Sequence, residues 1–249
     1  MKPGEKIYFA SDFHLGFLSY EKSLEREKKI VSWLDSIRSD ASEIYLLGDI
    51  FDYWFEYKKV VPRGFTRFLG KISEITDSGI PVHFFTGNHD IWVFDYLPRE
   101  TGIILHREPV IKEFNGLKFY LGHGDGLGPG DKKYKLLKKV FTSKTLQWLF
   151  ARLHPNFSVW FAHKWSHSSR FSKVNEPFKG EDKESLTIYA KEKLKTQHFD
   201  YFIFGHRHIT LNHPLTDKSR FIHTGDWINN FSYCVFDGEK AEIKFFILK

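Results

Sequence analysis

The 249-residue chain is predicted to fold as an α/β sandwich. Short apolar runs alternate with amphipathic segments through its first half, as strands and helices do when they follow one another along a chain. Hydrophobic residues make up 41% of the sequence and charged residues 27%, an ordinary balance for a globular protein. This length fits one domain or one domain with an insert. We therefore expect residues 1–249 to form a single domain.

The elements of the first half follow from the spacing of their apolar residues. Apolar side chains from Leu24 to Ile37 recur near helical spacing, which predicts a helix over 23–37. A second helix is predicted over 65–77. Strands are predicted where short apolar runs stand between these segments, at 6–10, 44–47, 82–85 and 117–121.

The pattern changes in the segment 131–175, which we predict to be a helical, basic insert or cap within the domain. From Asp131 to Lys173 the sequence has ten lysines and arginines against one acidic residue, although the whole chain carries a net charge of only +6. This local excess favours an anionic partner. The alternative is a solvated basic face on helices that only pack on the sandwich. After this segment we predict a helix at 181–196 and strands at 201–204, 221–223, 233–236 and 242–248.

Sequence features also bear on the compartment. The single cysteine, Cys234, excludes an internal disulfide and favours a reducing environment. The N-terminus lacks an apolar region followed by a small-residue cleavage site, so no signal peptide is expected. No run of about 18 uncharged apolar residues is present, so no membrane-spanning helix is expected.

Side chains capable of binding metal follow five of the predicted strands. They are Asp12 and His14, then Asp49, then Asn88, His89 and Asp90, then His123 and Asp125, then His206 and His208. Loops beyond strand ends are where open α/β sheets place ligands. Each cluster alone is most often a polar turn or a pair of solvated side chains. Their recurrence after five apolar runs indicates one shared site.

In order, these motifs read Asp-x-His, Gly-Asp, Gly-Asn-His-Asp, Gly-His and Gly-His-x-His. The series resembles the calcineurin-like metallophosphoesterases over nearly the whole chain. The resemblance implies two packed β-sheets flanked by helices, with two metal ions on loops at the sheet ends. It assigns Asp12, His14, Asp49 and His208 to one ion, and Asp49, Asn88, His123 and His206 to the other. Oxygen and imidazole ligands without thiolate suit Mn²⁺, the expected ion, with Fe or Zn²⁺ as alternatives.

Three further residues of these motifs have expected roles in hydrolysis. His89 is the candidate catalytic residue that donates a proton to the leaving oxygen or stabilises its developing charge. Asp90 would orient His89, as the family implies. The alternative is that both residues only form a structural turn. Asp125 either supports His123 or is a plain turn residue.

Two stretches resemble the UDP-2,3-diacylglucosamine hydrolase family of lipid A synthesis. They read GDIFDYWFEY at 48–57 and HGDGLGPGDKKY at 123–134, and the insert follows them between the fourth and fifth motifs. The resemblance implies a lipid-holding cap and cleavage of a pyrophosphate to UMP and 2,3-diacylglucosamine 1-phosphate. It implies substrate contacts from Asn88, His89, Asp131, Ser169, Lys173 and His206. His89 departs from the pattern, because the better-known branch of that family has arginine there.

A basic, apolar insert suits a protein that visits an anionic membrane to reach a lipid-linked nucleotide sugar. We therefore expect a cytoplasmic protein, peripheral on the inner membrane, without nucleic acid or an obligate protein partner. Two other functions remain open: a metallophosphoesterase for nucleotides, nucleic acids or phosphoproteins, and a non-catalytic binding module. A nuclease would bind DNA with steep salt dependence. A binding module would be expected to have lost ligands, whereas every ligand position here is filled.

Overall fold

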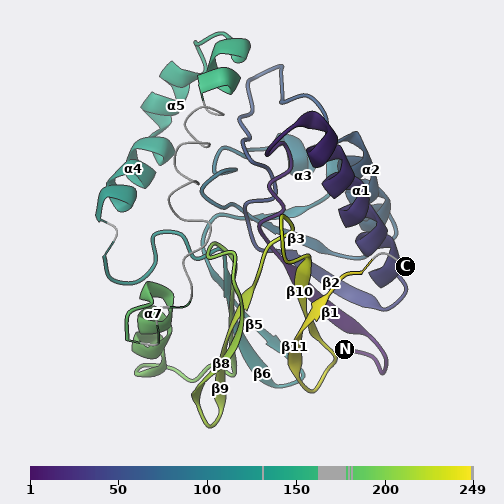
Figure 1. Ribbon diagram of the computed structural model, residues 1–249, viewed down its shortest axis with the longest axis vertical. Coiled ribbons are helices and arrows are strands. Elements are labelled where there is room, and N and C mark those ends of the chain that lie inside the picture. Colours follow the sequence, from purple (N-terminus) through teal and green to yellow (C-terminus); the bar gives the residue numbers. More distant parts are fainter. Residues whose placement is uncertain (131, 162–177, 179, 181, 248–249) are drawn as a thin grey trace.

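The computed structural model describes residues 1–130, 132–161, 178, 180 and 182–247 of the chain. Two β-sheets lie face to face, and helices lie along their outer faces (Figure 1). Helices α1 (Tyr20–Ile37), α2 (Thr66–Asp77) and α3 (Tyr96–Thr101) are on one side, and α7 (Ser185–Leu194) is on the other. The predicted sandwich of two sheets flanked by helices is confirmed.

The first sheet has six strands in the order β11-β10-β1-β2-β3-β4. Their bounds are β1 Lys6–Ala10, β2 Ala41–Leu46, β3 Val82–Phe85, β4 Ile104–His106, β10 Ser232–Phe236 and β11 Ala241–Phe245. Strands β1 to β4 pair in parallel, whereas β10 and β11 join the edge antiparallel. The loops after β1, β2 and β3 therefore leave the sheet at the same end.

The second sheet has five strands in the order β5-β6-β7-β9-β8. Their bounds are β5 Val110–Phe114, β6 Leu117–Gly122, β7 Tyr201–Phe204, β8 Thr210–Thr216 and β9 Ser219–Thr224. Strands β6, β7 and β9 are parallel to one another, and β5 and β8 flank them antiparallel. The loops after β6 and β7 thus also share one end of their sheet.

Both faces of the central strands are buried, which explains their continuous apolar runs. In β1, Ile7 and Phe9 enter the core between the sheets, while Tyr8 and Ala10 pack in the core that contains α1. This alternation is the ordinary period of a strand. On the far side, Leu186 of α7 packs with residues of the second sheet.

The insert segment is helical where the structure describes it. Helices α4 (Lys132–Thr142) and α5 (Lys144–Phe150) follow the loop after β6, and residues 155–161 are helical as well. No residue of α4 or α5 is fully buried. In Figure 1 these helices stand apart from the two sheets, at the end of the molecule reached by the metal-motif loops.

Four short elements were not predicted: α3, β4, β5 and β8. Strand β8 has the sequence TLNHPLT, without a fully buried residue and with Pro214 inside it. It lies at the edge of its sheet, where proline is tolerated and the apolar pattern weakens.

Among the described helices, none is both long and apolar enough to cross a membrane.

Candidate metal centre

Five motif loops meet at one point between the sheet ends. Backbone hydrogen bonds join them directly: Asp12 N–H donates to Gly48 O at 3.0 Å, and Gly205 N–H donates to His123 O at 3.1 Å. The loops therefore hold one another, and the side chains they carry face a common interior.

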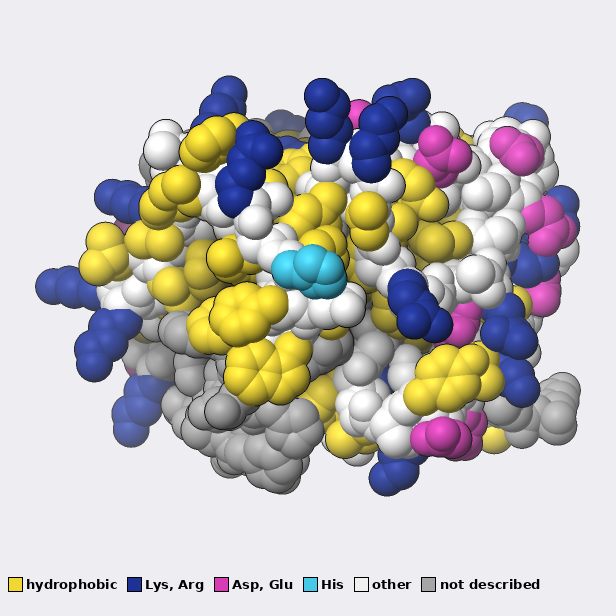
Figure 2. Space-filling view, turned by 90° about the horizontal axis from the view of Figure 1, so that it is seen from above, with side chains coloured by type: hydrophobic (Ala, Val, Ile, Leu, Met, Phe, Trp, Pro, Cys, Tyr) yellow, Lys and Arg dark blue, Asp and Glu magenta, His cyan; other side chains and the backbone are white. Residues whose placement is uncertain are grey.

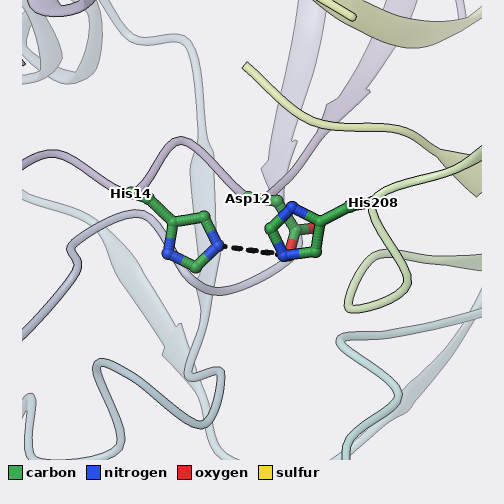
Figure 3. Close-up of side chains that lie close together, drawn as sticks. All are labelled: Asp12, His14 and His208. Atoms are coloured by element: carbon green, nitrogen blue, oxygen red, sulfur yellow. Dashed lines mark hydrogen bonds and ion pairs between the residues drawn. The ribbon is translucent and has the colours of Figure 1, made fainter. Parts of the chain in front are cut away.

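The first group of donors consists of Asp12, His14 and His208 (Figure 3). The Nε2 atoms of the two histidines lie 3.2 Å apart, and their rings stack with centroids 4.9 Å apart. Asp12 Oδ1 lies 3.4 Å from His208 Nε2 and 3.7 Å from His14 Nε2. Both imidazoles thus present a nitrogen to the same carboxylate oxygen.

The second group consists of Asp49, Asn88, His123 and His206. Asn88 Oδ1 lies 3.0 Å from His206 Nδ1 and 3.4 Å from His123 Nε2. Asp49 Oδ2 lies 3.4 Å from the same His123 nitrogen. Asp49, His123 and His206 form a compact donor cluster, which Asn88 completes.

Asp49 stands between the two groups. Its Oδ2 is 3.8 Å from His14 Nε2 of the first group and 3.4 Å from His123 Nε2 of the second. Its other oxygen accepts a hydrogen bond from the His89 backbone N–H at 2.8 Å. One carboxylate oxygen is therefore held so that the other faces both groups.

A divalent ion fits the first group because one oxygen there that could bind metal has no hydrogen-bond partner. Asp12 Oδ1 is buried without a hydrogen bond. Burying a carboxylate oxygen in this way is costly unless a cation offsets it. The other Asp12 oxygen is satisfied, because it accepts hydrogen bonds from Ser11 Oγ and from the His206 backbone N–H.

Burial and neighbouring charges shift the pKa values of these groups in different directions. Burial raises the pKa of Asp12. Burial would also raise the pKa of Asp49, but the neighbouring histidines, His123 foremost, hold it well below its usual value. Burial would lower the pKa of His123, yet the Asp49 carboxylate raises it to about 10. Burial, and after it the charge of His123, lowers the pKa of His206 to about 3. Anionic oxygen and neutral imidazole are the forms that bind metal, so the shifts of Asp49 and His206 favour metal binding, whereas those of Asp12 and His123 oppose it.

Two of the histidines have their tautomers set by backbone carbonyls. His123 Nδ1 lies 2.8 Å from Leu47 O, and His89 Nδ1 lies 3.0 Å from Asp52 O. Only a protonated nitrogen donates to a carbonyl oxygen, so Nε2 carries the lone pair in each neutral ring. For His123, this directs the lone pair toward Asp49 and Asn88.

The backbone of these loops is unusual at the ligand residues themselves. Positive φ angles occur at Asp12 (56°), His14 (46°), Asp49 (54°), His206 (69°) and His208 (55°). This left-handed region disfavours residues with a side chain, and such conformations gather at functional sites. The strained backbone at these residues thus turns their side chains into the site.

Two glycines of the motifs are required by close approach. A Cβ on Gly48 would lie 2.6 Å from His123 Nδ1, and Gly48 also has a φ of +88°. A Cβ on Gly205 would lie 2.6 Å from Asp12 Oδ2. A side chain at either position would push a candidate ligand out of place.

The carboxylate of Asp90 is held by backbone groups of the metal loops. Its carboxylate accepts hydrogen bonds from the backbone N–H groups of Gly87 at 2.7 Å and Ile50 at 2.8 Å. Asp52, which was not expected here, lies beside His89 through its carbonyl oxygen and through a carboxylate oxygen 3.9 Å from Nδ1. Asp90 therefore shapes the loop backbone, and Asp52 holds the imidazole.

Asp226 was missed in the sequence although it faces a candidate ligand. Its Oδ2 lies 3.6 Å from His208 Nδ1. Its Oδ1 accepts the backbone N–H groups of residues 228–230, and Asn230 Nδ2 donates to both Asp226 Oδ2 and His208 O. Such carboxylate–histidine pairs orient metal ligands. The only signal in the sequence is one more Gly-Asp pair after a strand, Gly225-Asp226.

Asp125 does not hydrogen-bond to His123. Its carboxylate accepts a hydrogen bond from Tyr134 Oη at 2.5 Å and pairs with Lys138 Nζ at 2.7 Å, both on α4. Three other expected contacts, Asp131, Ser169 and Lys173, lie outside the described residues.

Comparison with known proteins agrees with this arrangement. A family model described as calcineurin-like phosphoesterase matches residues 5–210. The chain is 40% identical to UDP-2,3-diacylglucosamine hydrolase of Porphyromonas gingivalis, over 94% of each chain. It is 29% identical to the enzyme of that name from Neisseria meningitidis serogroup A, over 97% of each chain. The counterpart from Haemophilus influenzae is 26% identical, over 96% of this chain and 97% of that one. The chain belongs to the calcineurin-like phosphoesterase family.

Proposed function

We propose that the protein hydrolyses the pyrophosphate of UDP-2,3-diacylglucosamine, giving UMP and 2,3-diacylglucosamine 1-phosphate for lipid A biosynthesis. The observation that carries this proposal is the pair of donor groups around Asp49, in a chain 40% identical to a hydrolase named for that substrate. A site of this kind suits transfer of a phosphoryl group to water, and the relatives supply the substrate class.

Two divalent ions, Mn²⁺ foremost and Fe or Zn²⁺ as alternatives, are the proposed cofactors. Asp12, His14, Asp49 and His208 would hold one, and Asp49, Asn88, His123 and His206 the other. Such a pair of ions supplies Lewis acidity for in-line displacement at phosphorus. The residues' own contribution is to fix the donor positions, since buried loops and backbone hydrogen bonds hold them before substrate arrives.

His89 is the proposed catalytic proton donor beside this centre. Its ring meets that of His14 edge-on at 5.0 Å, and its side chain remains 14% exposed. Because Nδ1 donates to Asp52 O, a second proton on the ring would sit on Nε2, and the resulting imidazolium would pass that proton to the leaving oxygen. Asn88, His89 and His206 would also contact the substrate phosphates.

An apolar cavity next to the metal loops supports a lipid substrate. It has a volume of about 590 Å³ and lies between the loop after His14, the loop after Asp52 and the helical residues 155–160 of the insert. Leu24, Val61 and Trp160 are among its lining residues. Burial of each methylene of an acyl chain would stabilise the complex by about 0.8 kcal/mol. We propose that residues 131–175 form a cap holding the acyl chains.

The remaining proposed substrate contacts are Asp131, Ser169 and Lys173. They fall in the same segment as the cap. Their assignment rests on resemblance alone, because the structure does not describe these positions.

The exposed side chains of the insert support a visit to an anionic membrane. We call these side chains the insert surface and define it by exposed apolar residues Leu136, Val140, Leu146, Trp148, Leu149, Leu153, Phe157, Trp160 and Phe161, with exposed Lys132, Lys133, Lys144 and Arg152. Figure 2, which looks down on this end of the molecule, shows hydrophobic side chains with lysines and arginines around them. Apolar side chains amid cations match a lipid surface with anionic headgroups. We infer a cytoplasmic enzyme, peripheral on the inner membrane, that needs neither nucleic acid nor an obligate protein partner.

The test is UMP release from UDP-2,3-diacylglucosamine by Mn²⁺-loaded protein, with a soluble bis-phosphoester measured alongside. Rapid UMP release with poor turnover of the soluble ester is the expected result. Turnover of the soluble ester alone would favour a phosphoesterase for another substrate, consistent with histidine rather than arginine at position 89. Turnover of neither, by protein shown to contain metal, would favour a binding module.

A further inference from the structure

The insert is attached to the metal loops by a buried polar contact. Asp125, two residues after His123, is only 5% exposed. Its Oδ2 accepts a hydrogen bond from Tyr134 Oη at 2.5 Å and lies 2.7 Å from Lys138 Nζ. The same ammonium group donates to the carbonyl oxygen of Asp125 at 3.3 Å. One aspartate of the loop thus holds two successive turns of α4.

A second attachment lies at the other end of α4. Trp92, two residues after Asp90, donates from Nε1 to Phe141 O at 2.8 Å. Its ring contacts that of Phe141 at 5.0 Å and stacks on that of Phe150 in α5 at 5.2 Å. This anchor is mainly aromatic, whereas the anchor at Asp125 is ionic.

Helix α4 therefore bridges two loops of the metal centre. Its first turns are fixed to the loop of His123, and its last turn is fixed to the loop that carries Asn88 and His89. Because no residue of α4 is fully buried, these few contacts have a large share in setting its position. A helix held so lightly moves easily when one contact is lost.

We propose that Asp125 and Lys138 are positioning residues, which fix α4 over the metal loops so that substrates engaging the insert bind productively. The proposal rests on the proposed function for its substrate and adds a specificity role for a residue pair that has no part in the chemistry. Small esters reach the metals without touching the insert, so the pair should not matter for them.

Lys138 differs in this respect from the lysine that follows it. Lys139 is on the same helix and is exposed, whereas Lys138 Nζ lies against the buried carboxylate. Replacing either by methionine removes one positive charge and keeps a similar length. The two variants separate loss of the contact with Asp125 from loss of general attraction for an anionic substrate.

The experiment compares Lys138→Met and Lys139→Met for steady-state kinetics on UDP-2,3-diacylglucosamine and on a soluble bis-phosphoester. Loss of a hydrogen-bonded ion pair at a buried carboxylate predicts a KM for the lipid substrate raised about tenfold in Lys138→Met, with kcat for the soluble ester unchanged. Lys139→Met should stay within about twofold of the parent on both substrates. The conservative Lys138→Arg keeps the positive charge, so its KM for the lipid substrate should stay close to that of the parent. Equal effects in the two methionine variants, or none in either, would overturn the proposal.

Backbone hydrogen exchange of α4 provides a measurement that does not depend on substrate. Lys138→Met should speed exchange over residues 132–142, and Lys139→Met should not. If the parent fails to turn over the lipid substrate, the proposed function fails while this comparison still reports on the contact. Unchanged exchange in Lys138→Met would exclude a positioning role.

Discussion

The metal loops and the insert are built in opposite ways. In the loops, candidate ligands such as Asp12, His14 and Asp49 are buried, and neighbouring backbones hold them in strained conformations. In the insert, α4 and α5 have no fully buried residue and expose Trp148 and other large apolar side chains. The contrast teaches that this chain fixes its chemistry rigidly and leaves its proposed substrate-holding part dependent on few contacts.

The largest expected effect is at the residue shared by the two donor groups. Asp49→Ala should lower kcat by more than about a hundredfold, since loss of even an outer partner of a metal ligand costs 10- to 100-fold. Metal analysis should show fewer bound ions per chain. Asp77→Ala, at an exposed aspartate, is the control. Unchanged metal content and rate would mean that Asp49 is not a ligand shared by two metal ions.

The next effect concerns the aspartate that faces His208. Asp226→Asn keeps an oxygen for the loop amides but removes the charge beside Nδ1, so metal affinity should fall about 10- to 100-fold. Calorimetric titration with Mn²⁺ measures it. Asp237→Asn is a matched control, because Asp237 accepts two backbone N–H groups in a turn, as Asp226 accepts three, but does not lie beside any of the described candidate ligands. Equal affinities in the two variants would deny Asp226 a part in orienting His208.

A smaller effect, on stability, tests how tightly the loops are packed. Gly48→Ala should lower the free energy of unfolding by about 2–4 kcal/mol, because its Cβ would strike the His123 ring. Gly79 has nearly the same φ, +89°, and a Cβ added there would have no atom within 4 Å, so Gly79→Ala should cost only about 1 kcal/mol. Urea unfolding of both variants gives the difference. Equal losses would show that backbone conformation alone, and not close approach, requires glycine at position 48.

The smallest effect on stability is expected on the insert surface. Replacing Trp148 and Trp160 by alanine should leave the free energy of unfolding within about 0.5 kcal/mol, since both are more than half exposed. Binding to vesicles containing phosphatidylglycerol should weaken about tenfold, because apolar contact area is lost. Phe245→Ala, at an equally exposed ring on β11, should bind as the parent does. Equal binding by all three proteins would remove the membrane role of this surface.

The sequence predicted the buried parts of the molecule best. The bounds of β1, β3 and β7 were predicted to the residue, because their apolar runs end at a polar motif and all their residues except Lys6 are buried. The motif residues of five loops do come together. Their gathering was predictable because parallel strands end at the same edge of a sheet.

What the sequence did not reveal depends on contacts between distant segments. Asp52 was hidden inside an aromatic run, and Asp226 lies 18 residues beyond His208 in the chain. Each lies beside a histidine only because the fold brings its loop back to the metal centre. Asp90 and Asp125 each follow a motif histidine closely in the sequence, which does not reveal that Asp90 also accepts backbone N–H groups or that Asp125 pairs with Lys138 of α4.

Titration of metal-stripped protein with Mn²⁺, monitored for bound ion and for UMP release in the same samples, tests the central claim most directly. Two donor groups that share Asp49 predict that two ions bind per chain and that activity rises as the second ion binds. Full activity with one ion per chain, or two bound ions without UMP release, would contradict it.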